Sequence, residues 1–178
     1  GHSIVTIKPE TRSIWTNATD TYFPYRPNKY GRSIKQASKA YTGYKPTIWR
    51  WRTEFQNDFA ARMDWCTMSF KEANHAPLPM LSHPDKLTIK AGETFTLDAF
   101  ESSDPDGDSL SFHWFNYQEA GTYTKNIEAN GPNNVHMAHF TAPKVEKEET
   151  VHFILKLTDK GEPPLSSYKR VLVTILPE

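Results

Sequence analysis

The sequence predicts a mainly β protein, in which an immunoglobulin-like or fibronectin-III-like sandwich follows an aromatic-rich segment that ends in one long amphipathic helix. Two observations predict this. From about position 86 onward, apolar and polar residues alternate in short segments that are separated by turn residues. From Thr47 to Phe70, apolar residues instead recur every three or four positions. Pro77 and Pro79 separate the two patterns, so we expect two parts, residues 1–75 and 76–178.

The predicted helix over 47–70 begins at Thr47, which follows a proline and is suited to the N-cap. Its apolar stripe consists of Ile48, Trp51, Phe55, Phe59, Met63, Cys66 and Phe70. So much aromatic surface on one face predicts packing against a core. We expect the helix to dock on the outer face of the sandwich, where Phe115, Tyr117, Ile154 and Leu172 would otherwise be exposed.

Tyrosine and proline dominate the stretch before the helix, residues 20–46, which contains few aliphatic residues. We expect a long loop without regular structure, a kind of segment that is often functional. Because a planar aromatic ring suits the C–H face of a pyranose, Tyr25, Tyr30 and Tyr44 are candidate carbohydrate-binding residues. The alternative is that these tyrosines only cover neighbouring structure.

Seven short strands are predicted for the sandwich, with Trp114 buried on the third strand. The inward residues are expected at Phe95 and Leu97, at Val151 to Leu157, and at Val171 to Ile175. In such a sandwich the third, sixth and seventh strands are neighbours. A domain with this fold binds a ligand or separates other domains. The fold alone does not indicate any catalytic reaction.

Composition narrows the class of protein further. The chain has 178 residues and no net charge, but residues 1–75 carry 12 Lys and Arg against 6 Asp and Glu, and residues 76–178 carry 9 against 15. The basic residues are scattered and form no nucleic-acid motif, so nucleic acid is not an expected partner. A single cysteine excludes an intrachain disulfide, and no stretch approaches the ~18 apolar residues that a membrane helix needs.

An acidic turn, Ser103-Asp-Pro-Asp-Gly-Asp108, lies between two predicted strands. Asp104, Asp106 and Asp108 are candidate calcium ligands, because crowded carboxylates repel one another unless a cation lies among them. The spacing departs from that of an EF-hand loop, and an ordinary Asx-type turn is the favoured alternative. We therefore expect no required cofactor, with calcium as the one metal to test.

No catalytic residue is identified. The chain lacks a phosphate-binding loop, a Gly-x-Ser-x-Gly nucleophile motif and a His-Glu-x-x-His metal motif. His136 and His139 are three positions apart in a predicted strand, so they point to opposite faces and do not chelate one metal.

Several segments resemble a bacterial family of cellulose-binding proteins that carry a nucleoside-hydrolase-like domain. The resemblance is most specific over 48–65, and it includes Glu10 to Asn17 and the Asn-His-Ala-Pro run at 74–77. It implies that residues 1–75 are the C-terminal tail of the hydrolase-like domain and that residues 76–178 are the family's Ig-like domain. Residues 1–75 contain no aspartate cluster like the one with which nucleoside hydrolases bind calcium.

The resemblance implies a non-catalytic C-terminal module of a secreted bacterial protein, extracellular or periplasmic, that binds a cellulose-like glucan or supports the hydrolase-like domain. One alternative is a part of a glycosidic or N-glycosidic hydrolase in which the 20–46 loop helps to form the substrate cleft. Another is a purely structural spacer.

Overall fold

The computed structural model describes residues 20–22, 25–27, 33–36 and 41–178. The chain divides into two compact units, Gly1–Phe55 and Gln56–Glu178. This division does not test the predicted domains 1–75 and 76–178, which stay a prediction. No helix in the described part of the chain is both long and apolar enough to span a bilayer.

The described residues of unit 1 form two small antiparallel strand pairs, the first helix and the start of the second helix. β1 (Asp20–Tyr22) pairs with β4 (Tyr41–Gly43), and β2 (Tyr25–Pro27) pairs with β3 (Ser33–Gln36). The prediction of a loop without regular structure over 20–46 is therefore wrong. Tyrosine, threonine and isoleucine favour extended backbone, and a break in register at Arg26 and Pro27 accommodates the proline that cannot donate to the ladder.

The long helix predicted over 47–70 is two helices, α1 (Pro46–Trp49) and α2 (Arg52–Asp64). At the break, the Trp51 amide donates to the carbonyl of Ile48, three residues back, at 3.1 Å. Aromatic and β-branched residues around this point have low helix propensity, which favours the interruption. The predicted cap at Thr47 is also wrong, because Lys45 is the N-cap and Thr47 Oγ1 donates to the carbonyl of Tyr44.

The apolar stripe is not buried. Phe59 and Met63 are 65% and 54% exposed, and Cys66 is also exposed. The buried residue of α2 is Ala61, and Asn57 donates its side-chain amide to the carbonyl of Pro164 at 2.9 Å. The expected docking of this stripe on the sandwich is therefore wrong, because periodicity shows which residues share a face and not what that face contacts.

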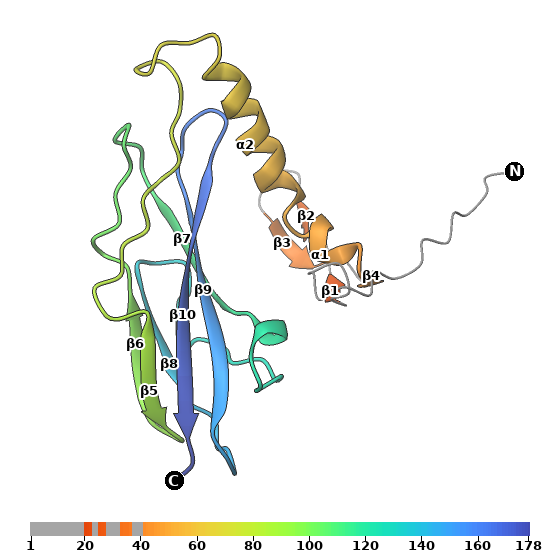
Figure 1. Cartoon of the computed structure of the whole chain (residues 1–178), viewed down its shortest axis with the longest axis vertical. Coiled ribbons are helices and arrows are strands. Elements are labelled where there is room, and N and C mark those ends of the chain that lie inside the picture. Colours follow the sequence, from red (N-terminus) through yellow and green to blue (C-terminus); the bar gives the residue numbers. More distant parts are fainter. Residues whose placement is uncertain (1–19, 23–24, 28–32, 37–40) are drawn as a thin grey trace, which may run out of the picture. The chain divides into compact units, whose positions relative to one another are not determined.

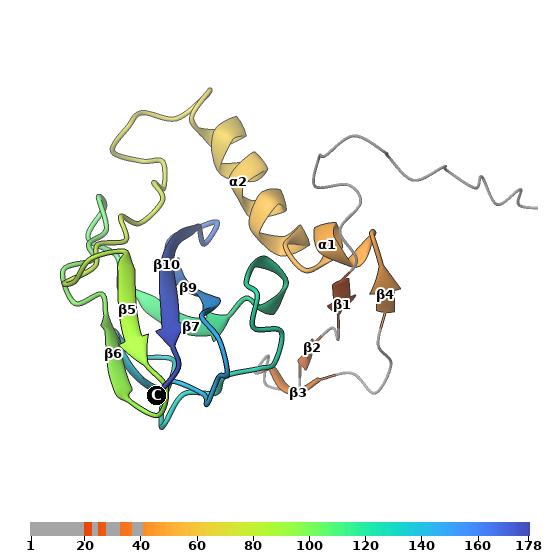
Figure 2. The ribbon, with the colours of Figure 1, turned by 60° about the horizontal axis from the view of Figure 1, so that its bottom comes forward.

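Unit 2 is dominated by a two-sheet sandwich (Figures 1 and 2). The larger sheet has the order β5-β10-β9-β7, and the smaller sheet pairs β6 with β8. The strands are β5 (Lys86–Lys90), β6 (Thr94–Asp98), β7 (Ser111–Asn116), β8 (Met137–Thr141), β9 (Glu149–Thr158) and β10 (Ser166–Leu176). β5 runs parallel to β10, and the other pairs are antiparallel.

The sandwich confirms the mainly β fold class but has six strands instead of seven. Between β7 and β8 the chain forms only the 3₁₀ helix η2 (Gln118–Ala120) and irregular structure. The strands predicted as third, sixth and seventh correspond to β7, β9 and β10, and their predicted adjacency is confirmed by the sheet order β10-β9-β7.

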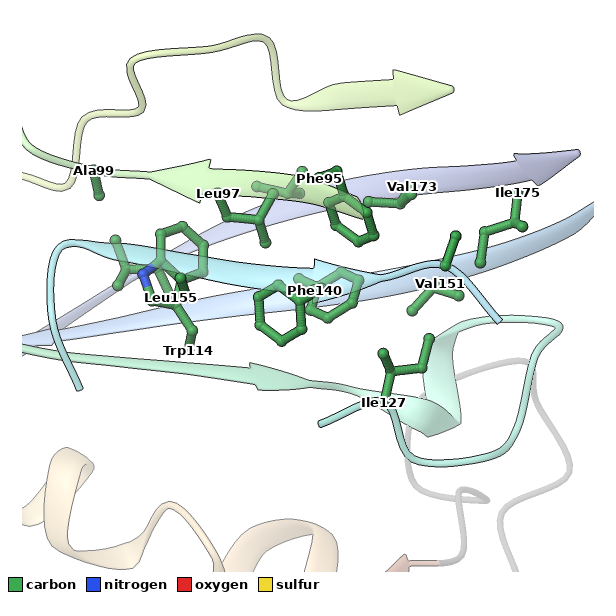
Figure 3. Close-up of a cluster of buried hydrophobic side chains, with 14 of the residues drawn as sticks. Phe95, Leu97, Ala99, Trp114, Ile127, Phe140, Val151, Leu155, Val173 and Ile175 are labelled. Carbon is green, nitrogen blue, oxygen red and sulfur yellow. The ribbon is translucent and has the colours of Figure 1, made fainter. Parts of the chain in front are cut away.

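Side chains from both sheets fill the space between them (Figure 3). Phe95 and Leu97 from β6 and Phe140 from β8 meet the inward residues of β9 and β10. Trp114 is fully buried, as predicted, and its indole N–H donates to the carbonyl of His136 at 3.3 Å, so its polar atom is satisfied.

Candidate functional site

A hollow of about 310 Å³ lies in unit 1 where β4 leads into α1. We call it the Tyr44 pocket, and its lining residues are Tyr41, Thr42, Gly43, Tyr44, Lys45, Pro46 and Trp49. Gly43 adopts a φ of 145°, which side chains disfavour, and so turns the chain at the end of β4. Pro46 then occupies the first turn of α1, where its missing N–H costs nothing.

The aromatic rings of this pocket are accessible. Tyr44 is 46% exposed and Trp49 is 41% exposed, and the ring of Tyr41 meets that of Trp49 edge-on with centroids 5.7 Å apart. The backbone of Tyr44 is fixed, because its carbonyl accepts hydrogen bonds from the amide and the hydroxyl of Thr47. The pocket thus presents planar apolar surface on a short, hydrogen-bonded turn.

Of the three tyrosines predicted to bind carbohydrate, Tyr44 lies in this pocket. Tyr30 lies outside the described residues, and Tyr25 is described only as part of the backbone of β2. Sequence reasoning did not select Tyr41 and Trp49 as site residues. The available signal was their spacing around Gly43 and Pro46, together with the position of Trp49 off the apolar stripe.

A second hollow, of about 340 Å³, lies in unit 2 just after α2. We call it the Trp65 pocket, and it is lined by Trp65, Met68, Ser69, Phe70, Ala73 and His75. The His75 ring contacts both other rings, with centroid distances of 3.9 Å to Phe70 and 6.0 Å to Trp65. This pocket was not predicted from the sequence, because it forms where a turn brings the end of α2 back to the linker.

Hydrogen bonds hold the rings of Trp65 and His75 in the Trp65 pocket. The indole N–H of Trp65 donates to the carbonyl of Asn74 at 2.7 Å. The carboxylate of Asp106 accepts the backbone N–H of His75 at 2.7 Å and lies 3.0 Å from His75 Nδ1. The predicted acidic turn is therefore connected to an aromatic pocket more than 30 positions away in the sequence.

The three predicted calcium ligands form a hydrogen-bonded turn. Asp104 Oδ1 accepts the backbone amides of Asp106 and Asp108, at 2.9 and 3.0 Å, and Gly107 has a φ of 81°. Burial raises the pKa of Asp108, and the charges of Asp104, Asp159 and Asp106 raise it further. Among the described residues, no group of three or more His, Cys, Asp or Glu side chains is arranged to hold a metal ion. The calcium site and the favoured alternative, a bare turn, both stay predictions.

His136 and His139 contact different partners. His136 Nδ1 lies 3.0 Å from the carboxylate of Asp98, and His139 Nδ1 lies 2.8 Å from the hydroxyl of Thr96. His136 precedes β8 and His139 lies within it.

A six-stranded, two-sheet sandwich of this topology defines a mainly β, Ig-like domain. Residues 94–175 match the family model of the C-terminal domain of the cellulose-binding protein Sde0182. The predicted resemblance is thereby confirmed for the sandwich. No curated protein matches the chain.

Solved structures extend the comparison. The chain is 33% identical to a nucleoside hydrolase-related protein of Saccharophagus degradans that is associated with carbohydrate metabolism, with a TM-score of 0.69. The match covers 86% of this chain and 40% of that protein. A 2,6-sialyltransferase of a Photobacterium species is 13% identical with a TM-score of 0.37, covers 52% of this chain and 17% of the enzyme, and carries no argument.

Proposed function

We propose that this chain is a non-catalytic, glycan-binding module of a secreted bacterial carbohydrate-associated protein, and that the Tyr44 pocket contacts a cellulose-like glucan. The observation that carries the proposal is the exposure of Tyr44 and Trp49 on one fixed turn. Sites for small ligands combine aromatic surface with a few polar groups. Here Lys45 and the tyrosine hydroxyls supply polar groups at the edge of the rings.

The names of the relatives support this ligand class. The family model describes a cellulose-binding protein, and the Saccharophagus degradans protein is associated with carbohydrate metabolism. The chain spans only 40% of that protein. We propose that the module functions beside a hydrolase-like domain, in an extracellular or periplasmic location where an insoluble glucan is accessible.

The composition of the two pockets supports a non-catalytic role. Neither the Tyr44 pocket nor the Trp65 pocket is lined by an Asp or Glu side chain. Most glycoside hydrolases need two carboxyl groups that flank the scissile bond, roughly 5–10 Å apart. The rival function, a hydrolase cleft formed partly by residues 20–46, predicts turnover of a nitrophenyl glycoside or a nucleoside, and we expect no turnover above the uncatalysed rate.

Retention on microcrystalline cellulose tests the assigned surface. The variant Y44A/W49A removes both exposed rings, and we expect its retention to fall at least tenfold relative to the wild type. I48A is the matched control, because Ile48 is 49% exposed on the same helix but does not line the pocket.

If Y44A/W49A is retained as well as the wild type, the binding surface does not include the Tyr44 pocket. The variant Y25A/Y30A then tests the remaining predicted tyrosines. If the wild type is not retained at all, the purely structural spacer is the alternative that remains.

A further inference from the structure

We infer that the Trp65 pocket is a second glycan-binding site, which takes one pyranose unit of a glucan chain. This inference rests on the proposed function, in that it assumes a carbohydrate ligand, but it assigns a site in the other unit of the chain. All the residues that line the pocket fall between Trp65 and His75, so the site is complete within unit 2.

The pocket offers aromatic faces to solvent. Phe70 is 73% exposed and Trp65 is 40% exposed, and the ring of His75 lies within 3.9 Å of the Phe70 centroid. The planes of Trp65 and His75 differ by only 11°, so these two rings stack on each other, and the Phe70 ring beside them is the most exposed aromatic surface of the pocket. Apolar C–H faces of a pyranose pack on such surfaces, whereas its hydroxyls need polar partners at the edge.

His75 supplies a polar partner for the sugar hydroxyls. Its Nδ1 faces the carboxylate of Asp106, and this contact leaves the opposite ring nitrogen, Nε2, to bond with a ligand hydroxyl. The guanidinium of Arg62, which is paired with Asp58, lies over the Trp65 ring with its carbon 5.6 Å from the ring centroid. A few polar groups around apolar faces give a small-ligand site its orientation and specificity.

Two of the three rings, those of Trp65 and His75, are held by hydrogen bonds before any ligand arrives. Trp65 is fixed by the carbonyl of Asn74, and Asn74 is itself buried and donates to the carboxylate of Asp159 and to the carbonyl of Pro163. Because the side chains are already ordered, binding loses little rotamer entropy. A shallow hydrogen-bonded platform is therefore suited to weak, reversible contact with a repeating chain.

Titration of the complete chain with cellohexaose, followed by NMR, tests the site. We expect saturable shifts of the Trp65 indole N–H and of the His75 ring signals. F70A should weaken this response at least tenfold without unfolding the domain, because Phe70 is mostly exposed. M80A is the matched control, since Met80 is a large, 51% exposed side chain that does not line the pocket.

Several results would overturn the inference: no shift of Trp65 or His75 at millimolar sugar, an equal response in F70A, or shifts that follow protein concentration because a second copy covers the pocket. The variant Y44A/W49A separates this inference from the proposed function. If Y44A/W49A loses cellulose retention and the Trp65 signals never respond to sugar, only the second site is wrong. If neither pocket responds and the wild type is not retained, the proposed function is wrong as well.

Discussion

Asn74 donates its side-chain amide to the buried carboxylate of Asp159 at 3.2 Å, across 85 positions of sequence. The same amide donates to the carbonyl of Pro163 at 2.8 Å. Asp159 Oδ1 accepts the backbone amides of Gly161 and Leu165 as well, at 3.0 and 2.9 Å. One carboxylate therefore joins the linker after α2 to the turn between β9 and β10.

Replacing Asp159 with alanine is expected to destabilise unit 2 by about 3 kcal/mol, because it leaves buried donors without an acceptor. Urea unfolding followed by circular dichroism measures the effect. The control is K160A, since the neighbouring lysine is exposed. Midpoints for D159A and K160A that agree within error would contradict this role.

We expect a Phe→Ala substitution to reduce the free energy of unfolding much more in the core than on the α2 stripe. Phe140 is 1% exposed between the sheets, and F140A should cost about 3–5 kcal/mol of unfolding free energy. Phe59 is 65% exposed, and F59A should change stability by less than about 0.5 kcal/mol. A large loss in F59A would show that the stripe is buried in solution.

His152 predicts a loss of stability in mild acid. Burial lowers its pKa, and the positive charge of Arg170 lowers it further. Its Nδ1 is buried without a hydrogen-bond partner in the described structure. Because the unfolded state, with a histidine pKa of about 6.5, binds the proton more readily, the free energy of unfolding should fall as pH drops below that value.

The variant H152Q removes this titration, so its unfolding free energy should depend less on pH between about 7 and 5. Chemical denaturation at both pH values gives the comparison. If H152Q and the wild type show the same pH dependence, the loss of stability in mild acid is due to other groups. His113 is one such group, since burial and the charge of Lys156 lower its pKa.

We expect the melting midpoint of the protein not to respond to calcium at the acidic turn. Asp104 and Asp106 already accept hydrogen bonds from the protein, which supports the favoured alternative of a bare turn. The melting midpoint should be equal in millimolar calcium and in chelator. A midpoint that rises with calcium concentration, and loses this dependence in D104N, would establish a metal site by linkage.

Much of the sandwich could be predicted from the sequence, because alternation along a strand directly reports which side chains face the core. Trp114 and the inward residues of β9 and β10 illustrate this, since each is buried as the pattern predicts. The same reasoning gave the wrong environment for Phe59. A helical stripe carries no information about its contact partner, and here α2 places Ala61 against the rest of the unit.

The sites were harder to predict because they depend on contacts between distant residues. Tyr44 could be selected from its neighbours in the sequence, and it lines a pocket. The Trp65 pocket requires Asn74 to meet Trp65, just after α2, and Asp106 to meet His75, and no local pattern marks those contacts. The bond between Asn74 and Asp159 is equally invisible in sequence, because each residue alone is typical of a turn.

Adsorption of the wild-type chain to microcrystalline cellulose tests the central claim most directly. The isotherm is measured by depletion of protein from solution, with a non-binding protein of similar size as the background. The account predicts saturable adsorption above background that soluble cellohexaose reduces. Adsorption no greater than the background at every concentration would contradict a glycan-binding role.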